Sequence, residues 1–495
     1  MRKILFLWFA SLMIFYNPIF AERPTFRGNK IEPKESKAAL ERDFKKSTLY
    51  ELPIGDILTF LKSQNGTAIN QKVELSLRLG TSLSCDMSLE LSNVALQSSN
   101  LNDTSASNRF VLKGYRTSNP EDEIRLVINE DFIGGFVEDG EQTFYIEPLW
   151  YHDKNTSQKA FVVYESHDAL SPNDNAKCGV ADSGELLPDV RHSNSAESVL
   201  RGAIKDIFID IGVDFSMFRE FGFASDKLFD FLYANMNNVR ANYQNVFKDN
   251  ITLRIGKVYV STCANCDPWT QSMDASVLLD AFANWEQSNN CGTNYGRSYL
   301  GQLWTARELQ VQGNTNVIGL AYIKNIGNSR AYHVLEHYTF SLSVLRSLTT
   351  HEIGHNFGAK HDFDIGASGC PPTTRPNFIM DPINQGANTW SKGSERSCDR
   401  NSVGTINDYY RDIDELFCPD GVDCGFVIFI RRNPTYVQFN AQNCSPNLTT
   451  VFQGVNAVSS NGTVYIRSGT TPERLKINYP CTLKAQGGTV VIGRN

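Results

Sequence analysis

The sequence lacks the features that mark nucleic-acid-binding, fibrous and integral membrane proteins. Its 47 basic and 54 acidic residues leave a net charge of −7 with no concentrated basic run, so no nucleic acid partner is expected. Apart from the N-terminus, no apolar run approaches membrane-spanning length, and residues 426–430 stop at Arg431 and Arg432. There is also no internal repeat and no low-complexity tract. With 41% hydrophobic and 20% charged residues, we expect a soluble globular protein without a stable membrane anchor.

The first 21 residues have the pattern of a signal peptide. Arg2 and Lys3 precede an apolar run over residues 4–16, and Ala21 ends a stretch suitable for signal peptidase. The alternative is a membrane anchor, but the apolar run is short for a bilayer and is followed by Asn17 and Pro18. We therefore predict a cleaved signal peptide at residues 1–21 and a secreted, extracellular protein.

Eleven cysteines in an exported chain predict disulfide bonds. Because the total is odd, at least one thiol is left unpaired or pairs with another molecule. Cys263 and Cys266 have CxxC spacing, but the chain has no second CxxC to complete a zinc ribbon. We interpret this pair as part of a disulfide-braced loop that also involves Cys291.

A chain of 495 residues is too long for one ordinary hydrophobic core and predicts about two to four domains. Residues 22–195 contain strand-like runs, such as 73–79 and 143–146, separated by Asn, Asp, Ser and Gly clusters. Loop signals at 171–175 and 182–184 mark the end of this β-rich domain. After Cys418, Val, Ile, Thr and Gly dominate, which predicts a small β module over residues 419–495.

Between these parts, residues 196–418 alternate between strand and helix patterns. Strands are expected at 204–214, 251–262, 302–308 and 316–323. One helix is expected from Ser225, with Leu228, Leu232, Val239, Tyr243 and Val246 at helical spacing, and a second over 277–286. Such alternation predicts an α/β layer.

A metal-binding pattern follows in the same domain. Residues 341–355 are expected to form one helix, on which Val344, Leu348, His351 and His355 form a single stripe. Two imidazoles four residues apart on a helix can both bind one Zn²⁺, at about 2.0 to 2.1 Å. Glu352 lies beside them, where it can act on a zinc-bound water rather than as a ligand.

Gly358 and His361 complete the predicted site. A glycine three residues after His355 can adopt the left-handed conformation that ends a helix, so that the chain turns back and delivers His361 as third ligand. Three protein ligands leave a fourth position for water, which is the catalytic arrangement of zinc. The sequence therefore predicts one catalytic Zn²⁺, and it does not indicate a calcium site.

Chance is a poor explanation of this pattern. The motif HExxHxxGxxHD over residues 351–362 fixes six positions, and a random match anywhere in the chain has a probability on the order of one in a hundred thousand. A competing HxxEH pattern, from His333 through Glu336 to His337, fixes only three. We interpret it as a chance match or a solvated segment.

The extended motif resembles the signature of the adamalysin, or reprolysin, branch of the metzincins, in which an Asp such as Asp362 follows the third histidine. Metzincins also have a Met-turn, and Met380 lies 19 residues after His361, where such a turn is expected. The resemblance implies that Met380 forms a hydrophobic floor beneath the metal. Because Pro382 stands two residues later, no tyrosine ligand is implied.

This resemblance extends over roughly residues 200–418 and implies a metzincin-like fold for 196–418, a twisted mixed sheet with helices. Gly319, Leu320 and Ala321 are similar to the edge strand that pairs with substrate, so peptide would bind by strand addition. The resemblance also implies a disulfide between Cys370 and Cys398, and one between Cys418 and Cys291. No cysteine-dense disintegrin region follows Cys418, so adhesion through integrins is not implied.

Cys178, within the segment 176–180, resembles the cysteine switch of the family's precursors. A thiolate at the fourth zinc position would exclude water and leave an inert metal. The alternative is an ordinary disulfide between Cys178 and Cys85. Removal of the pro-segment, with Arg191 as a candidate processing site, would open the metal centre.

The sequence thus predicts a secreted zinc-dependent endopeptidase of adamalysin type, made as a latent zymogen and acting on proteins or peptides. Glu352 is predicted to be the general base, with His351, His355 and His361 as metal ligands. The alternative is a secreted binding or adhesion protein that keeps the metzincin fold without catalysis. A further alternative is a structural zinc domain, which would have four protein ligands and a closed site.

Overall fold

The computed structural model describes residues 23–64, 71–94, 98–156, 159–181, 205–247, 251–289, 298–326, 331–362, 377–393 and 401–413, apart from positions 34, 93, 174, 245, 324 and 325. In the C-terminal part it describes chiefly residues 435–437, 447–448, 463–474 and 480–493. The predicted signal peptide lies outside these ranges. Among the described residues, no helix combines the length and the apolar character that crossing a membrane requires.

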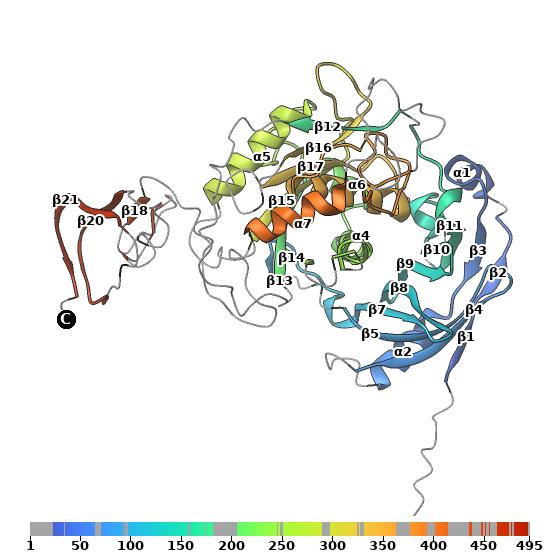
Figure 1. Cartoon of the computed structure of the whole chain (residues 1–495). Helices are drawn as coiled ribbons and strands as arrows, with labels where there is room; N and C mark the ends of the chain where they lie inside the picture. The colour runs from blue at the N-terminus through green and yellow to red at the C-terminus, as the bar shows by residue number, and fades with distance from the viewer. Residues whose placement is uncertain are drawn as a thin grey trace, which may run out of the picture.

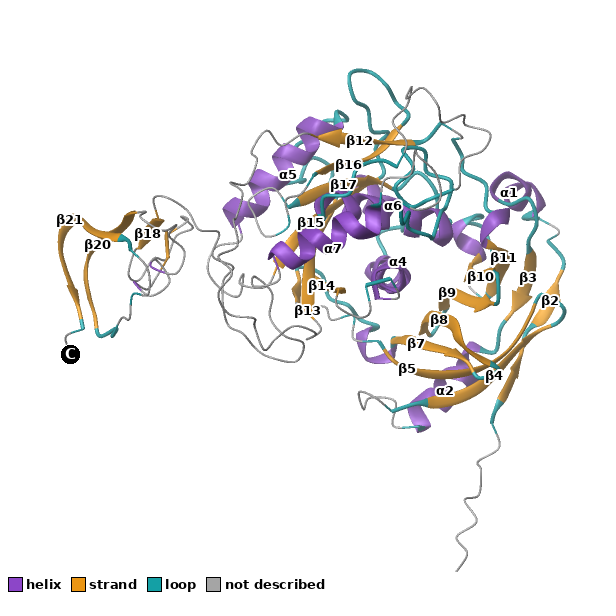
Figure 2. Cartoon of the chain, viewed as in Figure 1, coloured by secondary structure: helices purple, strands orange, loops and turns teal. Residues whose placement is uncertain are grey.

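Three sheets and seven α-helices organise the described residues (Figures 1 and 2). The helices are α1 (Lys37–Asp43), α2 (Ile54–Ser63), α3 (Phe215–Glu220), α4 (Ser225–Gln244), α5 (Ala275–Asn289), α6 (Leu342–Asn356) and α7 (Ser402–Ile413). The predicted helices from Ser225 and over 277–286 are α4 and α5.

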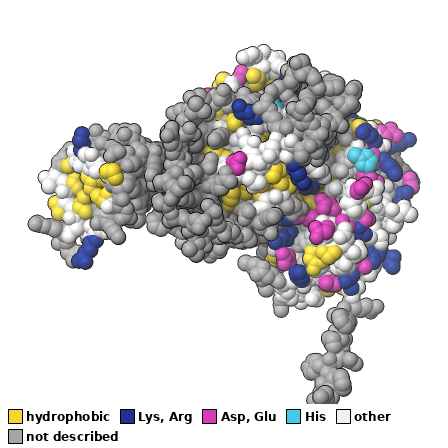
Figure 3. Space-filling model, in the orientation of Figure 1, with side chains coloured by type: hydrophobic (Ala, Val, Ile, Leu, Met, Phe, Trp, Pro, Cys, Tyr) yellow, Lys and Arg dark blue, Asp and Glu magenta, His cyan; other side chains and the backbone are white. Residues whose placement is uncertain are grey.

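The first sheet has ten strands in the order β1-β4-β5-β7-β8-β9-β10-β11-β3-β2, and neighbours from β4 to β2 pair antiparallel. Its strands are β1 (Thr25–Arg27), β2 (Asn29–Ile31), β3 (Thr48–Glu51), β4 (Val73–Leu79), β5 (Leu83–Leu91), β7 (Phe110–Arg116), β8 (Asn119–Asn129), β9 (Phe132–Asp139), β10 (Gln142–Pro148) and β11 (Ala160–Glu165). The predicted strands 73–79 and 143–146 are β4 and part of β10. In Figure 3 acidic and basic side chains are interspersed over this region.

The second sheet has seven strands in the order β12-β16-β17-β15-β13-β14-β6. These strands are β6 (Ser98–Ser99), β12 (Lys177–Ala181), β13 (Lys205–Val213), β14 (Ile251–Val260), β15 (Ser298–Thr305), β16 (Val317–Tyr322) and β17 (Tyr332–Glu336). Only β16 and β17 pair antiparallel, so the sheet is mixed. Its two edge strands, β6 and β12, come from the range predicted for the N-terminal domain.

Helix α4 lies between the two sheets, with β8 and β9 on one side and β14 on the other (Figure 1). This position explains why almost the whole helix is buried, including its asparagines. The leucine, valine and tyrosine stripe that predicted the helix is part of a core built from both sheets. A second core fills the space between the first sheet and α2.

The C-terminal residues form a third, four-stranded sheet in the order β19-β18-β20-β21, with parallel pairing throughout. Its strands are β18 (Thr435–Val437), β19 (Asn447–Leu448), β20 (Thr463–Thr471) and β21 (Thr482–Ile492). It has a small core of its own around Val464 and Ile466. The predicted limits of the three domains, 22–195, 196–418 and 419–495, stay predictions.

The competing HxxEH segment is not solvated, contrary to expectation. It forms β17, with His333 fully buried and His337 nearly so. His333 Nδ1 contacts Asn356 Oδ1 at 2.8 Å, and its Nε2 contacts the side-chain amide of Gln302 at 3.0 Å. The Glu336 carboxylate accepts a hydrogen bond from the Leu309 backbone N–H at 2.8 Å. These side chains support the core and do not converge on one point, because β17 is a central strand rather than a helix.

Burial sets the charge of His333. It lowers the pKa of this imidazole to about 4, from 6.5 in the unfolded chain. The Asn356 amide nitrogen donates to two backbone carbonyls, which leaves its oxygen to accept from Nδ1. The Gln302 amide oxygen lies 3.0 Å from Nε2 and cannot donate to a neutral ring, so the neutral form requires the Gln302 amide to be turned to present its nitrogen. We therefore assign the neutral form to the folded protein.

This assignment predicts acid sensitivity. Between pH 6.5 and 4 the unfolded chain binds a proton at His333 that the folded protein does not, so acidification favours unfolding, by on the order of 3 kcal/mol. Urea unfolding at pH 7.5 and pH 5, in chelator, should show a smaller loss of stability in His333→Gln than in the wild type. An equal loss in both proteins would show that His333 is already charged when folded.

Candidate metal centre

Helix α6 carries the first part of the site. It begins after Ser341, as predicted, and packs against β16 and β17. All its side chains are buried, because sheet and helices surround it. The helix ends at Asn356, and Gly358 has a φ of 92°. This left-handed conformation favours glycine and lets the chain turn back, as the sequence predicts.

The structure brings the three predicted histidine ligands together. The ring centroids of His351, His355 and His361 lie 4.6 to 5.1 Å apart. The Nε2 atoms of His355 and His361 are 3.2 Å apart. His351 Nε2 is buried with no hydrogen-bond partner among the described residues. Ring nitrogens so close together are expected where three imidazoles face one metal ion.

Backbone carbonyls orient two of these rings. His351 Nδ1 lies 2.6 Å from the carbonyl oxygen of Ile379, and His355 Nδ1 lies 2.7 Å from that of Ala359. A carbonyl oxygen only accepts, so each Nδ1 carries the proton and each Nε2 presents a lone pair. Burial lowers the pKa of His355 to about 4 and that of His351 well below its usual value. Both rings are therefore neutral, which is the form that binds metal.

The segment around Met380 supports the same helix. Met380 is fully buried, and a Cβ added at Gly354 would lie 2.7 Å from its sulfur. The Asp362 N–H donates to the Met380 carbonyl at 2.8 Å, which ties the third-ligand loop to this turn. The Asp362 side chain in turn accepts from the hydroxyls of Ser391 and Ser402. Sequence reasoning missed both serines, since no local pattern connects positions so far from Asp362.

Glu352 is fully buried beside the histidines. Apart from the neighbouring Cys178 thiol, neither carboxylate oxygen has a hydrogen-bond partner among the described residues. A Cβ added at Gly319 on β16 would lie 2.3 Å from Glu352 Oε1. The predicted edge strand thus passes directly against the predicted general base, and only a glycine leaves room for the carboxylate there.

Cys178 joins this cluster from β12. Its sulfur and ligand nitrogens of His351, His355 and His361 all lie within 4.8 Å of one another. Strand β12 pairs in parallel with β16, placing Cys178 opposite Gly319. On its other side, the Cys178 N–H donates to the Pro382 carbonyl at 3.1 Å. The backbone contact with Pro382 has no signal in the sequence.

The structure tests some of the predicted disulfide pairings. Cys178 and Cys85 are both free thiols, which contradicts a disulfide between them. Cys263 and Cys266 form a disulfide in the loop after β14. Cys291, Cys370, Cys398 and Cys418 lie outside the described residues, so their pairing stays a prediction.

The charges of this cluster fit a bound cation. Burial raises the pKa of the Glu352 carboxyl and of the Cys178 thiol well above their usual values, and the two groups also lie close to each other. An anion at either position therefore requires compensation by positive charge. Neutral imidazoles with a thiolate are a donor set that suits Zn²⁺. The residues present therefore fit the predicted metal.

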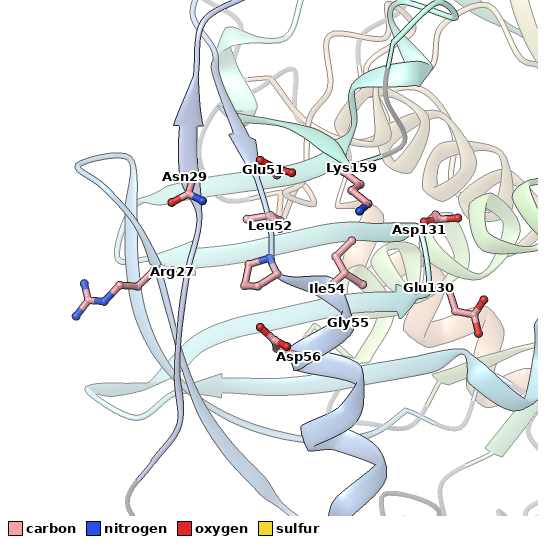
Figure 4. A pocket seen from close by; sticks show the side chains of 11 residues that line it. Arg27, Asn29, Glu51, Leu52, Ile54, Gly55, Asp56, Glu130, Asp131 and Lys159 are labelled. Atoms are coloured by element: carbon pink, nitrogen blue, oxygen red, sulfur yellow. The ribbon is translucent and has the colours of Figure 1, made fainter.

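A separate pocket lies on the N-terminal sheet. It has a volume of about 390 Å³ and is lined by residues such as Arg27, Glu51, Asp56, Glu130 and Lys159 (Figure 4). Its lining mixes both signs of charge and includes no histidine or cysteine. We therefore place the functional site at the histidine cluster, where the donor groups converge.

Comparison with known proteins agrees with this chemistry. Residues 206–391 match a reprolysin-type sequence model described as Metallo-peptidase family M12. The snake venom metalloproteinase trimerelysin-2 of Protobothrops flavoviridis is 27% identical over 183 residues, which cover 35% of this chain and 82% of the relative. A zinc metalloproteinase-disintegrin-like protein of Cerberus rynchops is 25% identical over 248 residues, 48% of this chain and 37% of the relative. The chain spans 40% of a third relative, the disintegrin-like atrase-B of Naja atra, at 23% identity.

The site and these relatives define a zinc metalloendopeptidase domain. Residues 206–391 resemble the adamalysin, or reprolysin, branch of the metzincins, whose sequence model they match. The mixed sheet and helices of this domain are compatible with that assignment.

The close approach at Gly319 gives a test of the assigned geometry. Gly319→Ala should displace the Glu352 carboxylate, because the new methyl group would lie 2.3 Å from Oε1. We expect peptidase turnover to fall at least about tenfold while zinc content is retained. Gly55→Ala is the matched control, since nothing lies within 4 Å of an added Cβ there. Full turnover in Gly319→Ala would contradict the placement of Glu352.

Proposed function

We propose that this protein is a secreted zinc endopeptidase made as a latent zymogen, in which Cys178 occupies the fourth position around one zinc ion. The observation that carries the proposal is the convergence of one thiol and three imidazoles within 4.8 Å. Three of these groups belong to the motif at residues 351–361, and the fourth comes from a segment some 170 positions earlier in the chain.

His351, His355 and His361 would hold the metal. When bound, zinc supplies Lewis-acid polarisation of a carbonyl and lowers the pKa of a water molecule. Glu352 is placed to take a proton from that water and to pass it to the leaving amine. Its oxygens have no hydrogen-bond partner among the described residues other than the Cys178 thiol, so the carboxylate is available as a base once Cys178 has left.

Strand β12 supports latency in a second way. It covers the backbone of Gly319, Leu320 and Ala321, the segment predicted to receive substrate. If β12 leaves, β16 becomes an edge strand, and its free N–H and C=O groups can pair with an extended peptide. Latency in this proposal combines a blocked metal with a blocked substrate strand.

A site with four protein ligands also matches a structural zinc site. This is the strongest alternative to the enzyme. Two observations support the enzyme instead. Glu352 is buried at the metal centre, where a structural site needs no free carboxylate. Cys178 also lies in an edge strand, so it can leave without breaking the sheet. An adhesion protein with this fold would likewise not need Glu352.

Cys178→Ala tests the proposal. The uncleaved variant should hydrolyse a quenched peptide, while the wild-type precursor stays silent until proteolysis in the segment 182–204, which includes Arg191. The double variant with Glu352→Gln is the matched control, and it should bind zinc but turn over several orders of magnitude more slowly.

Two results would count against the proposal. Precursors that are equally silent until cleaved would reject the role of Cys178 and leave steric cover by β12 as the cause of latency. Full activity in the double variant would reject Glu352 as the base.

A further inference from the structure

The N-terminal sheet and the metallopeptidase domain share one aromatic core. Trp150 and Tyr151 follow β10, and both are almost fully buried. Trp150 lies 6.1 Å from Phe221 between ring centroids, and Tyr151 lies 6.4 Å from Phe231 and 5.1 Å from Phe340. Departure of the N-terminal sheet would expose this cluster to water. Apolar contacts of this kind are typical of lasting interfaces.

Buried polar contacts cross the same boundary. Arg346 of α6 donates to the Tyr145 hydroxyl at 3.1 Å and lies over the ring of Phe136. Arg125 of β8 donates to the side-chain oxygen of Gln244, at the end of α4, at 2.7 Å. These groups are almost inaccessible to solvent. Partners matched in the interior in this way give an interface its specificity as well as its strength.

Glu147 of β10 caps the start of helix α6. Its Oε2 accepts from the Leu342 N–H at 2.8 Å, while Ser341, the N-cap residue, makes no side-chain cap bond. The Tyr164 hydroxyl adds contacts at 3.2 Å to Glu147 and 3.4 Å to the Ser343 N–H. A carboxylate at a helix N-terminus satisfies free N–H groups and compensates the helix dipole. The helix that carries His351, Glu352 and His355 is thus capped by the N-terminal sheet.

His152 and Asp43 hold the Glu147 side chain in place. The His152 ring lies between Asp43 and Glu147, at 2.8 Å from Asp43 Oδ2 and 2.9 Å from Glu147 Oε1. Burial opposes a charge on His152, but the two carboxylates outweigh it and raise its pKa. All three groups belong to the N-terminal region, so that region alone supplies the cap of α6.

The N-terminal region also holds the sheet edge opposite β12. Strand β6 pairs with β14, and the Asn100 side chain donates to the Val260 carbonyl at 2.9 Å and accepts from its N–H at 2.8 Å. A cut between Ala181 and Lys205 leaves β6 attached to the N-terminal region. It turns β12 into a short C-terminal tail that can separate from β16 alone.

We infer that residues 23–172 remain bound in the mature peptidase, and that Glu147 is a positioning residue for the active-site helix. Activation then displaces only the β12 segment from β16, and the N-terminal sheet is a lasting part of the enzyme. This inference rests on the proposed function, because it assumes that the protein is an enzyme activated by cleavage. The interface itself can be tested without measuring enzyme activity.

Two sites for a sequence-specific protease, one after Pro172 and one between Ala181 and Lys205, would free the β12 segment. We expect the fragment that ends at Pro172 to co-elute with the remainder in size-exclusion chromatography at submicromolar concentration. Separate elution of the two fragments would overturn the inference. Co-elution without hydrolysis of a quenched peptide would leave the interface intact and count against the proposed function instead.

Glu147→Gln tests the positioning role. It keeps the volume of the side chain but replaces the carboxylate with an amide, which faces the three donors of Leu342, Tyr164 and His152. Hydrogen exchange at the Leu342 amide should become at least about fivefold faster, the effect of losing a cap. In the activated enzyme kcat should fall severalfold with KM unchanged. Glu165→Gln is the control, since Glu165 is a partly exposed β11 residue that contacts Gln142.

Wild-type exchange and wild-type kcat in Glu147→Gln would overturn the role of Glu147. If that variant does not fold, Tyr164→Phe removes the neighbouring hydroxyl at the same helix end and should accelerate exchange at the Ser343 amide. Unchanged hydrogen exchange at the Ser343 amide in a folded Tyr164→Phe protein would also overturn the positioning role.

Discussion

Five side chains that are well solvated in the unfolded chain meet in the interior of this protein: three imidazoles, one thiol and one carboxylate. Desolvation opposes any charge on the four that are buried, which lowers the pKa of His351 and His355 and raises that of Glu352 and Cys178. Hydrogen bonds do not compensate this desolvation cost at His351 Nε2, which has no partner among the described residues. At Glu352 the only described neighbour that could compensate it is the Cys178 thiol. A divalent cation at the centre is the one compensation that suits all five.

Much of the surrounding structure holds these groups close together. Helix α6 sets the spacing of His351 and His355, and the turn at Gly358 returns His361 to them. The segment around Met380 orients the first ring and secures Asp362. The N-terminal sheet, through Glu147, caps the other end of the helix. Metal binding, helix capping and the proposed latency are therefore linked through α6.

The sequence was informative where chemistry is local. A helix period placed His351 and His355 on one face, and glycine at position 358 indicated the turn that the φ of 92° now shows. The same reasoning misjudged His333 and His337, because a short apolar strand in the centre of a sheet has no period that separates it from an exposed segment. Burial there depends on which strands lie on either side.

Long-range relations could not be predicted in the same way. Glu147 and Leu342 are 195 positions apart, and only the packing of two sheets around α4 brings them together. The asparagines of α4 are buried because a sheet covers each side of the helix. The position of Cys178 was predicted by resemblance and not by its spacing from the histidines, since the register of β12 against β16 is set by the folded sheet.

X-ray absorption at the zinc edge of the uncleaved precursor tests the central claim most directly. The account predicts three nitrogen neighbours at about 2.0 to 2.1 Å and one sulfur at about 2.3 Å, with the sulfur lost in Cys178→Ala. A wild-type precursor whose zinc has only nitrogen and oxygen neighbours would contradict it.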